Sequence, residues 1–184
     1  MLFSSHMKQP LTHRLKWSLA MGLLATLLSL VGCDQQRIKE LEEGVSTEAD
    51  VKARFGEPEK VWDAPASAAA GTRVFEYNRQ PAGVANYMIS IGPDGKMSAL
   101  RQVLQPQNFA KVLPGMPMED VRKLLGKPMK ITPYELKKEV NWDWRFQPGP
   151  NAGEKQIFTV VFNPDMKVLS TGTAPDREVE GNAR

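Results

Sequence analysis

The eight-residue stretch VKARFGEP at positions 51–58 returns as VRKLLGKP at positions 121–128. Valine, glycine and proline keep the same spacing in both places. Farther along, IGPDGKM at 91–97 aligns in the same way with FNPDMKV at 162–168. Matches in one order, at nearly one offset of about 70 residues, are the signature of an internal duplication. The sequence therefore predicts two copies of one structural unit.

Each copy opens with residues typical of a pair of short helices. In the first copy we expect a helix over 36–43 that Gly44 ends. A second helix, capped by Ser46 or Thr47, should run to Phe55, because a Gly-x-Pro sequence follows it and stops it.

The second copy repeats this plan. A short helix is expected over 108–113, followed by Gly115, which aligns with Gly44 at nearly the same offset. Pro117 suits the first position of the next helix, and Gly126 with Pro128 should end it.

Three strand-like runs follow each helix pair. In the run 139–146, large apolar side chains alternate with polar ones, as in a strand with one buried face. The expected strands span 72–79, 84–91, 96–104, 139–146, 155–162 and 167–173. The predicted fold class is α+β: two tandem ααβββ units, each a helix pair packed on a three-stranded antiparallel sheet.

A unit of this size buries too little surface to be stable alone. We therefore expect the copies to pack against each other or to share one continuous sheet. The Ala-rich loop at 64–71 is expected to be mobile.

The N-terminus has the features of an export signal. Residues 17–32 carry no charge and follow three basic residues, Lys8, Arg14 and Lys16. The run is short for a spanning helix and has the length of a signal-peptide core. It ends in Leu-Val-Gly-Cys at 30–33, which resembles the bacterial lipobox.

That resemblance implies cleavage before Cys33, the only cysteine of the chain, and attachment of acyl chains to it. Several acyl chains hold a protein stably on a bilayer. A buried or reactive thiol is the alternative interpretation of Cys33. Asp34 follows directly, and in enteric bacteria aspartate at that place is associated with the inner membrane.

Composition excludes several classes of function. The formal charge of +3 comes from the predicted signal peptide, so the rest is neutral and has no field that would favour nucleic acid. The two histidines, His6 and His13, also lie there. A mature chain without histidine or a free thiol cannot build a Ser-His-Asp triad, a Cys-His pair or a histidine-ligated metal site. We expect no enzyme activity, no metal and no cofactor.

The pattern Val-x-Pro-Gly-Met-x4-Val-x3-Leu-Gly-x-Pro at 112–128, together with the Trp-x-Trp strand, resembles the BamE (SmpA/OmlA) family of lipoproteins. The family implies an anchor in the outer membrane facing the periplasm. It also implies an accessory role in the machine that inserts β-barrel proteins, with contacts to its subunits and to anionic phospholipid. The tandem arrangement is also similar to β-lactamase inhibitor proteins. Unlike the single-copy pattern, this chain is duplicated and lacks a Gln-Gly-Asn-like stretch after the cysteine.

The expected organisation is a signal peptide at 1–32, a lipidated tether at 33–37, BamE-like repeats at 38–104 and 105–173, and a disordered tail at 174–184. The predicted function is a non-catalytic, lipid-anchored periplasmic adaptor for barrel assembly or envelope integrity.

Two alternatives to the adaptor remain open. One is a module that binds an enzyme or a ligand on a sheet face, for which the candidate residues are Trp142, Trp144, Tyr77 and Tyr87, although aromatic stripes on strands are usually core. The other is a carboxylate-dependent hydrolase, disfavoured because the acidic residues lie beside Lys or Arg in helical patterns.

Overall fold

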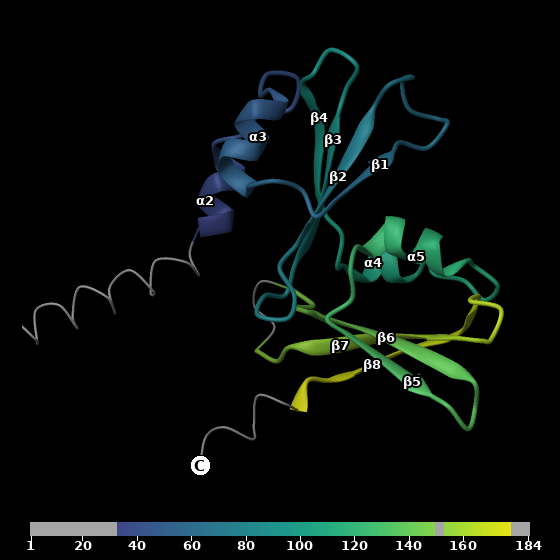
Figure 1. Cartoon of the computed structure of the whole chain (residues 1–184). Helices are drawn as coiled ribbons and strands as arrows, with labels where there is room; N and C mark the ends of the chain where they lie inside the picture. Colours follow the sequence, from purple (N-terminus) through teal and green to yellow (C-terminus); the bar gives the residue numbers. More distant parts are fainter. Residues whose placement is uncertain (1–32, 150–152, 178–184) are drawn as a thin grey trace, which may run out of the picture. The chain divides into compact units, whose positions relative to one another are not determined.

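The computed structural model describes residues 33–149 and 153–177 (Figure 1). The predicted signal peptide, the side chain of Cys33 and the end of the predicted tail lie outside this part. The chain divides into two compact units between Glu40 and Leu41. The first contributes one described helix, α2 (Cys33–Lys39), which includes the residues expected to form the tether. The helix expected over 36–43 therefore begins three residues earlier and ends at Lys39, before Gly44. The second unit contains both repeats.

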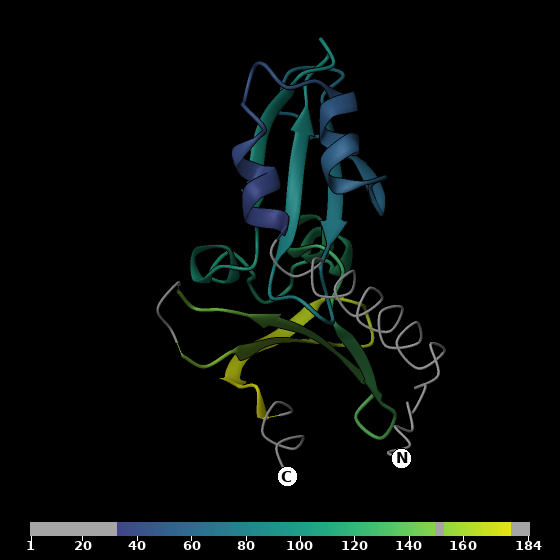
Figure 2. The same ribbon diagram turned by 90° about the vertical axis from the view of Figure 1, so that its left-hand side faces the viewer.

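The first repeat contains one helix of this second unit and one antiparallel sheet. The helix is α3 (Glu48–Phe55). The strands follow in sequence order, and each pairs with the next: β1 (Lys60–Asp63), β2 (Arg73–Asn78), β3 (Asn86–Ile91) and β4 (Met97–Gln102). Figure 2 shows α3 running along this sheet.

The second repeat has the same order of elements. A short helix, α4 (Pro106–Phe109), precedes α5 (Met118–Leu125). A second antiparallel sheet follows, again in sequence order: β5 (Lys130–Tyr134), β6 (Glu139–Phe146), β7 (Gln156–Phe162) and β8 (Val168–Pro175). Helices α4 and α5 cover one face of this sheet (Figure 1). Pro117 is the N-cap residue of α5, just before the helix, and does not occupy the first helical position as expected.

Each sheet has four strands, so the predicted count of three is wrong. The added strands are β1 and β5, both at an outer edge. They are short and mostly exposed, and Pro133 interrupts the hydrogen-bonding pattern of β5, which is tolerated only at an edge. Such segments lack the apolar alternation by which the other strands were recognised.

Equivalent backbone contacts in the two repeats confirm the duplication. The Gly44 N–H donates to the Met97 carbonyl at 2.7 Å, and the Gly115 N–H donates to the Val168 carbonyl at 2.8 Å. Each repeat also carries a β-bulge at the equivalent place of its third strand. The two sheets are separate, so the alternative of one continuous sheet is wrong.

Each repeat buries one face of its helix. Thr47 caps α3 by accepting from the Asp50 N–H, while the Asp50 carboxylate accepts from the Thr47 N–H. This reciprocal capping box positions Val51 and Phe55, which are both buried. In the second repeat α5 buries Val121 and Leu125, and the opposing strands contribute a core of aromatic and branched side chains: Trp142, Trp144, Phe146, Phe158, Val160 and Phe162.

A buried carboxylate connects the two repeats. Glu76 of β2 is fully buried, yet its oxygens accept from the Trp62 indole N–H, the Lys127 backbone N–H and the Arg122 guanidinium. Two of these donors belong to the second repeat. Burial of a carboxylate is costly unless its lone pairs are used, so this set of donors fixes the repeats together.

Two amide side chains extend this connection. Asn86 is fully buried, and its amide donates to the carbonyls of Leu125 and Lys127 at 2.9 and 3.0 Å. Gln80 exchanges two hydrogen bonds with the backbone of Arg145, where β6 continues beyond the end of β5. The Gln80 amide thereby satisfies the Arg145 backbone N–H and C=O, as the backbone of a neighbouring strand would.

Strand β8 continues to Pro175, past the expected start of the tail at 174. Asp176 follows it, buried and ion-paired with Arg145. Within residues 33–149 and 153–177, no helix has the length and apolar character needed to cross a membrane.

Candidate docking groove

The candidate site is built around Trp62, the only buried residue of β1. Alternation along this strand turns Trp62 inward, where its indole N–H donates to Glu76 at 2.9 Å. The Lys60 ammonium lies 3.7 Å from the centre of the Trp62 ring, within the range of a cation–π contact. The Trp62 ring is thus contacted by Glu76 at its N–H edge and by Lys60 over its face.

A groove of about 640 Å³ opens beside this tryptophan, and we call it the β1 groove. Its apolar surface comes from both repeats: Trp62, Ala64, Pro65, Val74, Met116 and Leu124. Four charged side chains, Asp63, Lys111, Asp120 and Lys123, complete the lining. Apolar walls with a few charges are typical of sites that bind a chain segment or a small ligand.

Each lysine of the groove contacts a neighbouring side chain. Lys123 makes an ion pair with Glu119 at 2.7 Å, and this hydrogen bond raises the pKa of Lys123 and lowers that of Glu119. The Lys111 ammonium donates to Asn108 at 2.9 Å. The groove therefore offers an apolar channel with cations at fixed positions and carboxylates beside them.

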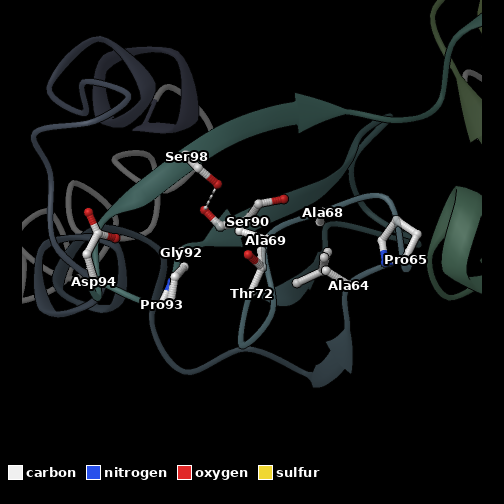
Figure 3. A pocket seen from close by; sticks show the side chains of 11 residues that line it. Ala64, Pro65, Ala68, Ala69, Thr72, Ser90, Gly92, Pro93, Asp94 and Ser98 are labelled. Carbon is white, nitrogen blue, oxygen red and sulfur yellow. Dashed lines mark hydrogen bonds between the residues drawn. The ribbon is translucent and has the colours of Figure 1, made fainter.

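Two further hollows adjoin the groove. One of about 530 Å³ shares Trp62 and is lined by residues from the start of α5 and from the β7–β8 turn. The other, of about 560 Å³, shares Ala64, Pro65 and Val74 (Figure 3). Figure 3 shows its small side chains and the bond from the Ser98 hydroxyl to the Ser90 carbonyl, at 3.4 Å.

The Ala-rich segment at 64–71 contributes to the lining of the β1 groove and of the 560 Å³ hollow. The Ala64 N–H donates to the Thr72 carbonyl, and the Ala68 N–H donates to the Pro65 carbonyl. These bonds close the loop onto the base of the β1–β2 connection. Its alanines form a smooth apolar wall instead of contributing functional groups.

The four aromatic residues suggested for a sheet-face site do not meet in this groove. Trp142, Trp144, Tyr77 and Tyr87 are between 0% and 8% exposed and lie in the cores of the two repeats. The Trp144 indole N–H donates to the Gly126 carbonyl at 3.1 Å. The Tyr77 hydroxyl donates to the Gly56 carbonyl, and burial raises its pKa to about 12.

The groove residues were missed in the sequence because no motif marks them. Trp62 sits in a strand of four residues, and Leu124 is only partly buried and packs at the edge of the second repeat's core. The one available signal is a tryptophan between charged residues in a run too short to classify. Over the described part of the chain, no cluster of three or more His, Cys, Asp or Glu side chains could hold a metal ion.

Comparison with protein families finds one match. It covers residues 102–172 and is described as the outer membrane protein assembly factor BamE domain. The second repeat matches the BamE domain. The matched segment contains α4, α5 and the whole second sheet up to Gly172, and hence the wall of the groove that carries Lys111, Met116 and Leu124.

No characterised protein matches the chain by sequence. Two solved structures match the chain in the structural comparison. One is a DUF4309 family protein (YjgB) from Bacillus subtilis, with 22% identity, a TM-score of 0.26 and coverage of 74% of this chain and 82% of that one. The other is a putative beta-lactamase inhibitor protein from Streptococcus mutans, with 12% identity, a TM-score of 0.32 and coverage of 70% and 82%. At these scores neither bears on the function of this chain.

Proposed function

We propose that this protein is a non-catalytic, lipid-anchored adaptor in the periplasm that supports the assembly of β-barrel outer-membrane proteins. The observation that carries the proposal is the BamE domain match over 102–172. The lipobox-like sequence before Cys33 supports it independently, because it gives the adaptor a place at a membrane surface.

The β1 groove is the proposed docking site, and its occupant is a segment of a subunit of the barrel-assembly machinery. The BamE domain forms the α5 wall of the groove, while the first repeat supplies Trp62 and the Ala-rich loop. A segment with apolar side chains fits the channel, and an acidic side chain on it would pair with Lys111 or Lys123.

Site-specific crosslinking tests this docking directly. A photo-reactive amino acid replaces Lys123 in the full-length chain, expressed in a Gram-negative host from which the native copy has been deleted. We expect irradiation to produce an adduct that contains an assembly subunit. Glu57 is the matched control, since its side chain is 76% exposed and belongs to no groove described above. Equal adducts at both positions, or none at Lys123, would contradict the docking site.

Deletion tests the cellular role. Without the protein, we expect lower levels of folded, heat-modifiable barrels in the outer membrane. An unchanged barrel profile would contradict the assembly role even if the groove binds a partner.

The anchor has its own test. The Cys33→Ser variant should leave the membrane fraction or remain unprocessed, because the thiol that carries the first lipid is gone. A processed Cys33→Ser protein that stays with the membrane would contradict lipidation.

A further inference from the structure

The outer edge of β8 carries backbone groups that no described residue covers. The Asp176 N–H bonds to the Lys155 carbonyl directly across the β7–β8 pair. Backbone groups alternate in direction along an antiparallel strand, so Ser170, Gly172 and Ala174 face β7. The N–H and C=O groups of Thr171 and Thr173 therefore point away from the sheet, and both side chains are exposed.

The equivalent edge of the first repeat is closed. Leu100 of β4 occupies the place of Thr171, and its outward N–H donates to the Glu43 carboxylate at 2.9 Å. The same carboxylate pairs with Arg101, which occupies the place of Gly172. The alignment of Gly44 with Gly115 puts Pro114 where Glu43 stands, so the second repeat has no carboxylate there to cover its edge.

The other two outer strands are poor templates for pairing. Strand β1 has four residues with a charge at each end, and β5 contains Pro133, which has no N–H to donate. Strand β8 differs from both: over eight residues, VLSTGTAP, it has no charge, and its only proline is the last residue. Short length, charge and proline are the usual protections of an edge, and the segment of β8 from Val168 to Ala174 has no charge and no proline.

The sequence of the open segment is nearly symmetrical about Gly172. Threonine stands on each side of it, and Ser170 and Ala174, both small, follow outward. An antiparallel pair of such strands related by a twofold axis at Gly172 places Thr171 opposite the Thr173 of the other copy. A twofold interface must be complementary to itself, and this strand is.

We propose that β8 pairs with the β8 of a second copy of this chain, antiparallel and centred on Gly172. In this register Thr171 and Thr173 of each copy face one another as hydrogen-bonded pairs, each exchanging two backbone bonds. Pro175 falls outside them. The pairing joins the two second-repeat sheets into one sheet, with threonine pairs, which are favourable across strands, on either side of the axis.

Both ends of β8 are fixed by contacts within the second repeat. At its start Val168 exchanges bonds with Gly115 and Met116, and at its end Asp176 is buried and paired with Arg145. Between these fixed points the segment 169–175 is exposed. A strand ordered before binding loses little entropy when it pairs.

Disulfide formation tests the pairing in the full-length chain. At the twofold axis Gly172 meets Gly172 as a non-hydrogen-bonded pair, whose short Cα separation suits a disulfide. No atom of the described chain lies within 4 Å of a Cβ added there, so Gly172→Cys has room. We expect oxidation to give about tenfold more covalent dimer than in the wild type, whose only cysteine is the proposed lipidation site Cys33.

Two variants control this experiment. Arg101→Cys puts a thiol at the equivalent place on the closed edge and should stay at background. Adding Thr171→Lys and Thr173→Lys to Gly172→Cys should remove the dimer, since lysines then face lysines across the axis. Circular dichroism checks that this triple variant is folded. A Gly172→Cys dimer no stronger than that of Arg101→Cys would overturn the proposal, as would adducts with another protein in place of the dimer.

Discussion

Single buried polar residues decide how the two repeats meet. Glu76 and Asn86 come from adjacent strands of the first sheet, and each is satisfied by groups at the C-terminal end of α5. Their partners include backbone atoms of residues 125 and 127, which only this course of the chain presents. Such hydrogen bonds specify one arrangement of the repeats where apolar contacts alone would permit several.

Gly126 and Gly56 are equivalent helix ends with different surroundings. Both have positive φ, 76° and 84°, with ψ near 180°, a backbone region that is essentially restricted to glycine and costs other residues on the order of 1–3 kcal/mol. A Cβ at Gly126 would lie 2.9 Å from the Asn86 amide nitrogen, whereas a Cβ at Gly56 meets nothing within 4 Å. We predict that Gly126→Ala destabilises the protein by clearly more than Gly56→Ala. Urea denaturation of both variants measures this, and equal losses would show that the Asn86 contact tolerates displacement.

The sequence could not reveal these residues. A Glu and an Asn within strands read as exposed positions, because their partners in the second repeat lie 39 to 51 residues away in the sequence. The same holds for Trp62, whose role depends on Glu76. By contrast, the helix end at Gly56 and the alternation of tryptophans at 142 and 144 depend on local geometry, and the structure agrees with what was expected of them. The expectation that Gly44 ends a helix is wrong, because α2 already ends at Lys39.

At the level of elements, the strands with apolar alternation were predicted to within about two residues at most ends, while β1 and β5 were missed. Strand β6 begins and ends where the pattern indicated. The missed strands are edge strands whose stability comes from pairing with β2 and β6, so their own sequences carry little signal. The same pairing creates the β1 groove, which was missed for the same reason.

The cap on β4 predicts a local dependence on pH. The hydrogen bond from the Leu100 N–H lowers the pKa of Glu43 below its usual 4.5, and the nearby Arg101 side chain lowers it further. A lowered carboxyl pKa means that the stabilisation is complete above pH 4.5 and is lost as the pH falls through the lower folded-state value. We predict that the hydrogen-exchange protection factor of the Leu100 amide falls over that range. Glu43→Gln keeps an acceptor without titrating, so a fall that persists in this variant would rule out Glu43 as its cause.

At the scale of the whole molecule, residues 41–177 should behave as one cooperative body. The core of the second repeat includes Met88 of the first sheet, and Glu76 receives donors from both repeats. Units that share buried contacts of this kind unfold together. The duplication is thus visible in the order of elements, but we expect no trace of it in the unfolding transition.

The variant Glu76→Ala tests this cooperativity. It leaves the Trp62 and Lys127 N–H groups and the Arg122 cation without their acceptor, which costs about 3–5 kcal/mol. We predict one calorimetric transition, shifted down by roughly 10 °C for a domain of this size. Glu76→Gln retains an acceptor and should shift less. A split transition, with the second repeat melting at its original temperature, would show that the repeats are independent.

The shared hydrogen bonds of Glu76 and Asn86 also limit how this protein can be rearranged. A gene fragment encoding the first repeat alone would expose the Glu76 carboxylate and the Asn86 amide on a surface that is buried in the full chain. Both groups would lack the hydrogen-bond partners that the second repeat supplies. The complementary fragment would lose the acceptor for Lys127 and the cover over α5. Although the two repeats have the same order of elements, neither can be exchanged alone for the repeat of another protein. Such an exchange must replace Glu76 and Asn86 together with the residues that bind them in the second repeat.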